Sequence, residues 1–299
     1  MFMSYVRLCA NSWQIYRGAV PNAVLLLMAV GVLTGLTTVL FGFGGGFVTV
    51  PAVYGALQTI AQGGRHGQMG TSAMHVAVAT SAVVMIANSA LATVTAQRRG
   101  LLVRRYLWPL TLFLAIGSAL GALAAGGVSE ALLHVLFVGY VAATFADSLL
   151  RKGFVNQSGQ PGVGKPLPAA ARSVGGVAIG AIASFLGVGG SVIIVPLLRR
   201  QGVAMGGATA MANALSLPIA IAGSVIYALP AGAGAAGAPA GQVGSISIVA
   251  AGALLAGSLP AIVVSRRAFT GRIPDRVHAA GYLVLLGIVL IVMTATLWG

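Results

Sequence analysis

Long apolar stretches, each about as long as a lipid bilayer is thick, constrain this chain more than any other feature. A helix crosses the hydrocarbon core with roughly 17 to 25 mostly apolar residues. Stretches of this kind run over residues 22–41, 71–96, 106–125, 130–149, 206–229, 243–264 and 277–298, with shorter apolar pieces near 46–60, 174–187 and 190–198. The pattern predicts an all-α polytopic membrane protein with about eight spans and eight to ten helical segments.

The scarcity of charge supports a lipid environment. Only 7% of the 299 residues are charged, whereas soluble domains carry about 25%. The three acids, Glu130, Asp147 and Asp275, are too few to cover a core in water, and we expect them to act as helix caps or in ion pairs. The net charge of +14 comes from short basic clusters between apolar stretches. Such clusters are typical of membrane topology signals, so the lipid bilayer is the expected partner and no nucleic acid is.

A glycine-rich pattern occurs twice in the chain. Residues 41–51 (FGFGGGFVTVP) match residues 186–196 (LGVGGSVIIVP) at an offset of 145. A second match pairs Gly117-Ser118 with Gly257-Ser258 in later apolar stretches. The repetition predicts a duplication. The expected parts are an interfacial lead-in over 1–20, a first transmembrane repeat over 21–150, a cytoplasmic linker over 151–171 and a second repeat over 172–299.

The positions of the basic residues predict that the two repeats insert in opposite orientations. If the first two elements of each repeat form a hairpin at the glycine pattern, fourteen basic residues lie on one side and Arg7, Arg17 and Arg65 on the other. Parallel insertion would give ten against seven. Cytoplasmic loops carry the excess of Lys and Arg, so an inverted repeat with both termini outside is favoured.

The two glycine patterns are also the leading candidates for a binding site. Consecutive glycines break a membrane helix, and the N–H groups that are released need new partners. Transporters place anions where paired broken helices meet, close to helix N-termini. The alternative is that these glycines only permit close helix packing. The candidate residues are Gly44, Gly45, Gly46, Gly189, Gly190 and Ser191.

Polar residues inside apolar helices form a second set of candidates, because each costs free energy in hydrocarbon unless it faces a cavity or a neighbouring helix. Hydroxyl and amide groups there can bind an oxyanion or simply hydrogen-bond between helices. The residues are Thr80, Ser81 and Asn88 in one helix, and Asn213 and Ser216 in its counterpart in the second repeat.

The remaining charged and titratable residues suggest weaker roles. His75, near a helix start, is either interfacial or part of a proton relay. The arginines at 98, 99, 104 and 105 are expected to anchor the cytoplasmic face, with attraction of anions to an inner vestibule as the alternative. No nucleophile with its base and no cluster of metal ligands is apparent, so we expect neither an enzyme nor a cofactor.

The two glycine patterns, together with Ala79-Thr80-Ser81 and Leu217-Pro218-Ile219-Ala220, resemble those of the sulfite exporter TauE/SafE family. The resemblance implies a multi-pass permease of the bacterial inner membrane, with duplicated halves and seven or eight spans. With that number of spans, the hairpin helices are either full crossings or re-entrant half-helices. It also implies movement of sulfite, sulfonates or other small organic anions. One departure is Met211-Ala212, where the second half of the family often repeats Thr-Ser.

The favoured function is therefore secondary transport of a small anion by rocking about the glycine patterns. A P-loop is absent from the sequence, which favours an ion gradient or exchange as the driving force. Two alternatives stand beside it: a non-transporting assembly or sensing subunit, and a channel. The sequence does not indicate the anion, the direction of transport or an oligomeric state.

Overall fold

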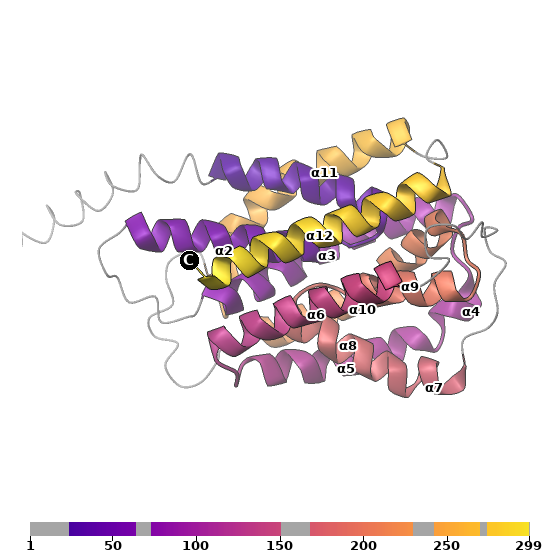
Figure 1. Ribbon diagram of the computed structural model, residues 1–299, viewed down its shortest axis with the longest axis horizontal. Helices are drawn as coiled ribbons and strands as arrows, with labels where there is room; N and C mark the ends of the chain where they lie inside the picture. The colour runs from indigo at the N-terminus through magenta and orange to yellow at the C-terminus, as the bar shows by residue number, and fades with distance from the viewer. Residues whose placement is uncertain (1–23, 64–72, 151–167, 230–241, 270–273, 299) are drawn as a thin grey trace, which may run out of the picture.

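The computed structural model describes residues 24–63, 73–150, 168–229, 242–269 and 274–298, and the long elements in these ranges are helices that run side by side in one bundle (Figure 1). Eight of the described helices are long and apolar enough to cross a membrane. They are Val24–Phe41, Ala73–Arg98, Arg104–Ala125, Glu130–Leu150, Ala169–Leu186, Met205–Ala228, Ile248–Arg267 and Asp275–Thr296. The prediction of an all-helical protein with about eight spans is confirmed.

The elements follow one another in a simple order. The first helix, Val24–Phe41, is followed by α2 (Gly46–Gly63), α3 (Ala73–Arg98), α4 (Arg104–Leu107), α5 (Leu110–Ala125) and α6 (Glu130–Leu150). Then come α7 (Ala169–Arg172), α8 (Val174–Leu186), α9 (Ser191–Arg200), α10 (Met205–Ala228), β1 (Gln242–Val243), β2 (Ile246–Ser247), α11 (Ile248–Phe269) and α12 (Asp275–Trp298).

Two helices, α2 and α9, are not among the eight spans. Helix α9 has ten residues, which at about 1.5 Å per residue is roughly half of a hydrocarbon core about 30 Å thick. It forms a half-helix hairpin with α8. Helix α2 returns from the end of the first helix in the same way (Figure 1). Of the two hairpin forms considered from the sequence, the re-entrant one fits α9.

The hairpins open toward opposite ends of the bundle. Helices α4 and α7 and the C-terminal part of α9 lie at the right in Figure 1, whereas α2 extends to the left, toward the end that holds the chain's C-terminus. An inverted repeat requires this arrangement, but the duplication itself and its boundaries stay predictions from the sequence. The predicted lead-in and most of the linker lie outside the described residues; α7 begins at Ala169, inside the predicted linker.

We call the right-hand end the basic end. Two ion pairs tie its helix ends together: Arg199 of α9 to Asp275 of α12, with 2.6 Å between Nη1 and Oδ2, and Arg200 to Asp147 of α6, with 2.5 Å between Nη2 and Oδ2. The end of α3 and the last turns of α11 also carry arginines there. The expectation that the acids serve as caps and ion pairs is confirmed for these two residues.

Glycines bring two helix pairs into backbone contact. A Cβ added to Gly117 or Gly121 of α5 would lie 2.0 or 2.1 Å from a backbone oxygen of α8. A Cβ added to Gly31 or Gly257 would lie 2.3 or 2.0 Å from a backbone oxygen across the contact of the first helix with α11. These glycines permit close packing, which is a different use from that in the two broken patterns.

One expected helix boundary was wrong. The apolar stretch predicted to be helical from residue 243 begins as a short antiparallel hairpin of β1 and β2, and α11 starts only at Ile248. Gly244 has a φ of +56°, which turns the chain between the two strands. Hydropathy reports which residues prefer lipid but not where the chain turns, so it did not show this boundary.

Candidate functional site

The two glycine patterns interrupt their helices at conformations that favour glycine. In the first pattern Gly42, Gly44 and Gly45 have φ values of +75°, +60° and +96°; in the second, Gly187 and Gly189 have +68° and +67°. A side chain is strained in this left-handed region. Each pattern therefore ends one helix and starts another, at Gly46 for α2 and at Ser191 for α9.

The two patterns touch each other at the centre of the bundle. A Cβ added to Gly46 would lie 2.6 Å from the backbone oxygen of Gly187, closer than any side chain can approach. The N-terminal end of α2 therefore lies against the break between α8 and α9, although the patterns are 145 residues apart. The positive ends of both helix dipoles lie in this region, where they favour an anion.

Each pattern is held by a polar side chain from a long helix of the other half. The N–H of Gly44 donates to Oδ1 of Asn213 on α10 (3.2 Å), and Nδ2 of Asn213 donates to the carbonyl of Thr38 (3.0 Å). The hydroxyl of Ser81 on α3 lies 2.8 Å from the carbonyl oxygen of Gly187, to which it donates. Helices α3 and α10 thus fix the broken segments.

Met85 of α3 lies between the two patterns. A Cβ on Gly44 would be 2.8 Å from Cγ of Met85, and a Cβ on Gly189 would be 2.4 Å from its sulfur. The side chain is 1% exposed. Methionine is flexible and apolar and fills irregular gaps, so its side chain fills the space between Gly44 and Gly189.

Several buried polar atoms around the patterns have no hydrogen-bond partner. Among the described residues these include Oγ1 of Thr34, Nδ2 of Asn88, and the hydroxyls of Ser89, Ser191 and Ser216. The Ser89 hydroxyl and Asn88 Nδ2 would be 2.5 and 2.6 Å from a Cβ on Gly44 and Gly45, respectively. An unsatisfied buried group costs about 1–3 kcal/mol, so each of these groups calls for a partner such as a bound water or ion, or for a functional role.

Most of the predicted site residues lie together. Gly44, Gly45, Gly46, Gly189, Ser81, Ser191 and Asn213 meet in or beside the two patterns. Gly190 faces the side chains of Ile194 and Ile219 instead. The Thr80 hydroxyl accepts a hydrogen bond from the N–H of Ser247 in β2 (3.0 Å for N to Oγ1). Whether these residues bind a substrate stays a prediction.

Other candidates lie away from the centre. His75 Nε2 is 2.9 Å from the carbonyl oxygen of Ala125, near the end opposite the basic end. The sequence reasoning missed Met85, because an apolar side chain in an apolar helix gives no signal. It also missed Ser89, although Ser89 directly follows the recognised candidate Asn88 and is equally polar.

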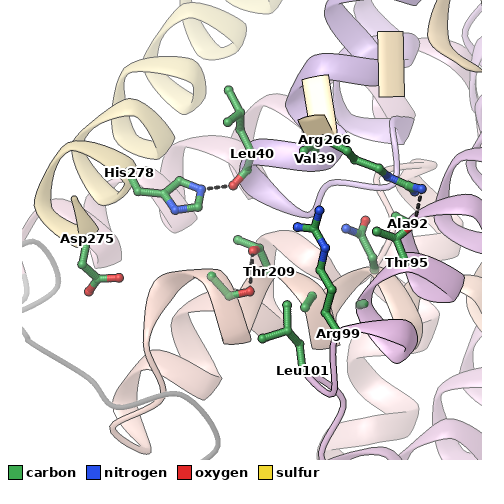
Figure 2. A pocket seen from close by; sticks show the side chains of 14 residues that line it. Val39, Leu40, Ala92, Thr95, Arg99, Leu101, Thr209, Arg266, Asp275 and His278 are labelled. Carbon is green, nitrogen blue, oxygen red and sulfur yellow. Dashed lines mark hydrogen bonds between the residues drawn. The ribbon is translucent and has the colours of Figure 1, made fainter. Parts of the chain in front are cut away.

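A cavity of about 250 Å³ opens at the basic end and reaches this centre. Arg99, which directly follows α3, lines it together with Arg266 of α11 and His278 of α12 (Figure 2). Thr209 and Asn213 of α10 complete this part of the lining. Asn213 is the same residue that binds Gly44. The cavity therefore leads from the arginine-rich surface to the first glycine pattern.

The only carboxylate that lines the cavity within the described ranges is already engaged. Oδ2 of Asp275 lies 2.6 Å from Nη1 of Arg199, and its Oδ1 accepts a bond from the N–H of Met205 at the start of α10 (2.8 Å). Nε2 of His278 is hydrogen-bonded to the carbonyl of Leu40. The positive charge in the cavity therefore comes from Arg99 and Arg266.

Broken hairpins that meet in a multi-span helical bundle are typical of membrane transporters. The chain matches the family described as Sulfite exporter TauE/SafE over residues 27–293, and it belongs to that family. Neither a curated protein nor a solved structure gave a match. The resemblance of the two glycine patterns to this family is thereby confirmed, and the family is one of transporters and not of enzymes.

Proposed function

We propose that the protein is a secondary transporter that carries a small oxyanion, such as sulfite, a sulfonate or an organic acid, through the junction of the two glycine patterns. The family supports transport of sulfite-type anions. The observation that carries the proposal is the contact between the patterns beside the unpartnered hydroxyls of Ser89 and Ser216. If the glycines served only close helix packing, apolar side chains could surround the contact, and no unsatisfied polar atoms would be needed there.

The chemistry of this junction suits an anion. The partners on offer are hydroxyls, an amide N–H and the N-terminal ends of two helices, and these groups donate to oxygen. None of the three acids supplies a group there: Asp147 and Asp275 lie at the basic end, and Glu130 lies at the far end, where it binds the N–H of Met74. A Ca²⁺ or Mg²⁺ site would be expected to include carboxylate oxygens, and the carbonyl oxygens of Gly187 and Thr38 at the junction already accept hydrogen bonds from Ser81 and Asn213.

Transport requires the junction to open to each end in turn. In this structure the Met85 side chain lies between Gly44 and Gly189, and Asn213 and Ser81 each hold one of the patterns. An anion that binds the Ser89 and Ser216 hydroxyls must displace the Met85 side chain.

The basic end is taken as cytoplasmic because cytoplasmic loops carry the excess of Lys and Arg. The membrane is taken to be a bacterial inner membrane, as the family resemblance suggests.

Uptake into proteoliposomes tests this proposal. Wild type, Ser89→Ala and Ser216→Ala would be compared with radiolabelled sulfite, ethanesulfonate and acetate. We expect saturable uptake by the wild type and, in each variant, a loss of about tenfold in kcat/KM, since a hydrogen bond to a charged group is worth about 1.5–3 kcal/mol.

Ser148→Ala is the matched control, because Ser148 is also buried with an unpartnered hydroxyl but lies near the C-terminal end of α6, away from the junction. Unchanged kinetics in all three variants would contradict the proposed site. Absence of saturable flux in the wild type with every anion would favour the assembly or sensing subunit, and unsaturable conduction would favour a channel.

A further inference from the structure

The cavity at the basic end has features that the junction does not explain. It is bounded by the ends of five helices: the first helix, α3, α10, α11 and α12. Its volume of about 250 Å³ has room for a small anion together with water. It lies between the exposed arginine-rich surface and the glycine patterns, so a substrate that enters from this end passes through it.

Two guanidinium groups share this cavity. Arg99 reaches into it from the end of α3, and Arg266 reaches in from the last turns of α11 (Figure 2). Two guanidinium charges that line one small cavity repel each other. The single acid of the described lining, Asp275, is bound to Arg199 and to the N–H of Met205. A pair of like charges in one cavity is stabilised by an anion between them.

The two arginines are held differently. Nη1 of Arg266 donates to the hydroxyl of Thr95, and its Nη2 donates to the carbonyl of Leu91. These bonds fix the guanidinium plane on the cavity wall. Arg99 is exposed and projects toward the middle of the cavity (Figure 2). One fixed and one adjustable guanidinium can close on oxyanions of different size.

The inner wall of the cavity leads directly to the first glycine pattern. Thr209 and Asn213 are four residues apart on α10 and therefore lie on one face of that helix. A Cβ on Gly42 would lie 2.6 Å from the carbonyl oxygen of Thr209, and Asn213 accepts the N–H of Gly44. An anion released by the arginines next meets these backbone groups.

We infer that Arg99 and Arg266 form a second anion site, separate from the junction, which binds one oxyanion with two or more oxygens on a single centre. Sulfonate, sulfite and carboxylate groups have this form and pair with guanidinium in a bidentate manner. The inference rests on the proposed function for its role as a waiting site for substrate. Binding itself does not depend on transport.

Calorimetric titration of the full chain in a maltoside detergent, which carries no phosphate, tests the site with ethanesulfonate and sulfite as probes. To isolate the cavity, the titrations use the Ser89→Ala/Ser216→Ala background, in which the junction is impaired. We expect one anion per chain, and a weakening of Kd by about tenfold in Arg99→Gln and in Arg266→Gln.

Arg98→Gln is the matched control. Arg98 precedes Arg99, is exposed and carries the same charge, but does not line the cavity, so its Kd is expected to stay within about twofold. Equal weakening by Arg98→Gln and Arg99→Gln would overturn the inference, because only net charge would matter. Arg266→Lys keeps the charge but loses the planar guanidinium that binds Thr95 and Leu91, so it should still weaken anion binding. This variant provides a second test of the site in case Arg266→Gln does not fold.

Two further outcomes separate this site from its alternatives. Binding that persists while the wild type shows no flux would support the arginine site and contradict the proposed function. A lipid phosphate offers the same oxygens. If short-chain phosphatidic acid binds this cavity and sulfonate does not compete with it, the site belongs to a lipid headgroup and the inference is overturned.

Discussion

At each end of the bundle a carboxylate accepts a hydrogen bond from the first turn of a long helix, but the surrounding contacts differ between the two ends. At the far end Oε1 of Glu130 accepts the N–H of Met74 at the start of α3 (3.0 Å). At the basic end Oδ1 of Asp275 accepts the N–H of Met205 at the start of α10 (2.8 Å), but its Oδ2 also pairs with Arg199. The two acids are separated by 145 residues, as the glycine patterns are.

The residue that lies 145 positions before Arg199 is Tyr54, which is neutral. Its hydroxyl accepts a bond from Nε2 of Gln58 (2.7 Å), and its ring packs edge-on against His134. The far end is therefore closed by aromatic and amide contacts, and the basic end by a buried charge pair, since Arg199 is 1% exposed. The comparison teaches that a similar backbone arrangement is held by hydrophobic packing at one end and by electrostatics at the other.

The largest effect is expected from Asp275→Asn. This change leaves the buried guanidinium of Arg199 without its carboxylate, which should lower the free energy of unfolding by about 3–5 kcal/mol. Glu130→Gln keeps an acceptor for Met74 and should cost less than about 1 kcal/mol. Thermal unfolding in detergent measures both. Equal losses of stability in the two variants would mean that the two ends are not stabilised differently. Partial recovery of stability in Arg199→Met/Asp275→Asn would show that the unpaired charge of Arg199 causes the loss at the basic end.

A smaller effect is expected from alanine in the two glycine patterns. Gly46→Ala places a methyl 2.6 Å from the backbone oxygen of Gly187, whereas Gly190→Ala meets the ends of two isoleucine side chains at 2.7 Å. Side chains can move aside and backbone cannot. We expect Gly46→Ala to cost about 1–3 kcal/mol and most of the uptake, with Gly190→Ala below about 1 kcal/mol. The reverse order would mean that the second pattern is the tighter one.

The smallest effect concerns two serines that follow glycines in the matched pairs. Ser258 donates to Oδ1 of Asn88 (2.8 Å), next to the first pattern, and Ser118 donates to the carbonyl of Ile219 (2.7 Å), near the second. Each change to alanine should cost about 1 kcal/mol. Only Ser258→Ala should also raise KM for the anion, because Asn88 is among the junction's polar groups. Uptake kinetics measure KM in both variants. A change of KM in both variants, or in neither, would contradict the assignment of Asn88 to the junction.

Much of the fold could be predicted from the sequence because the bilayer imposes long apolar helices. The eight spans and the breaks at residues 42–45 and 187–190 follow from hydropathy and glycine alone. The β1–β2 hairpin could not be predicted in this way, because its residues are as apolar as the helix that follows. Its turn depends on the local conformation of Gly244.

The site was predictable only in part, for a similar reason. Glycines and polar residues stand out in an apolar sequence, so Gly44, Gly189, Ser81 and Asn213 were accessible to sequence reasoning. Met85 was not, because only its position between two backbones distinguishes it. The partnership of Arg99 with Arg266 also depends on tertiary structure, since one is at the end of α3 and the other on α11.

The glycine seams seen in the packing restrict how the bundle can move. One seam joins α5 to α8 and the other joins the first helix to α11, with backbones in contact in each. Interlocked backbones cannot slide without first separating, so each seam moves as one rigid body. Both seams join a helix that precedes residue 150 to a helix that follows residue 172. If transport proceeds by the proposed rocking motion, each moving body would therefore contain helices from both halves of the chain.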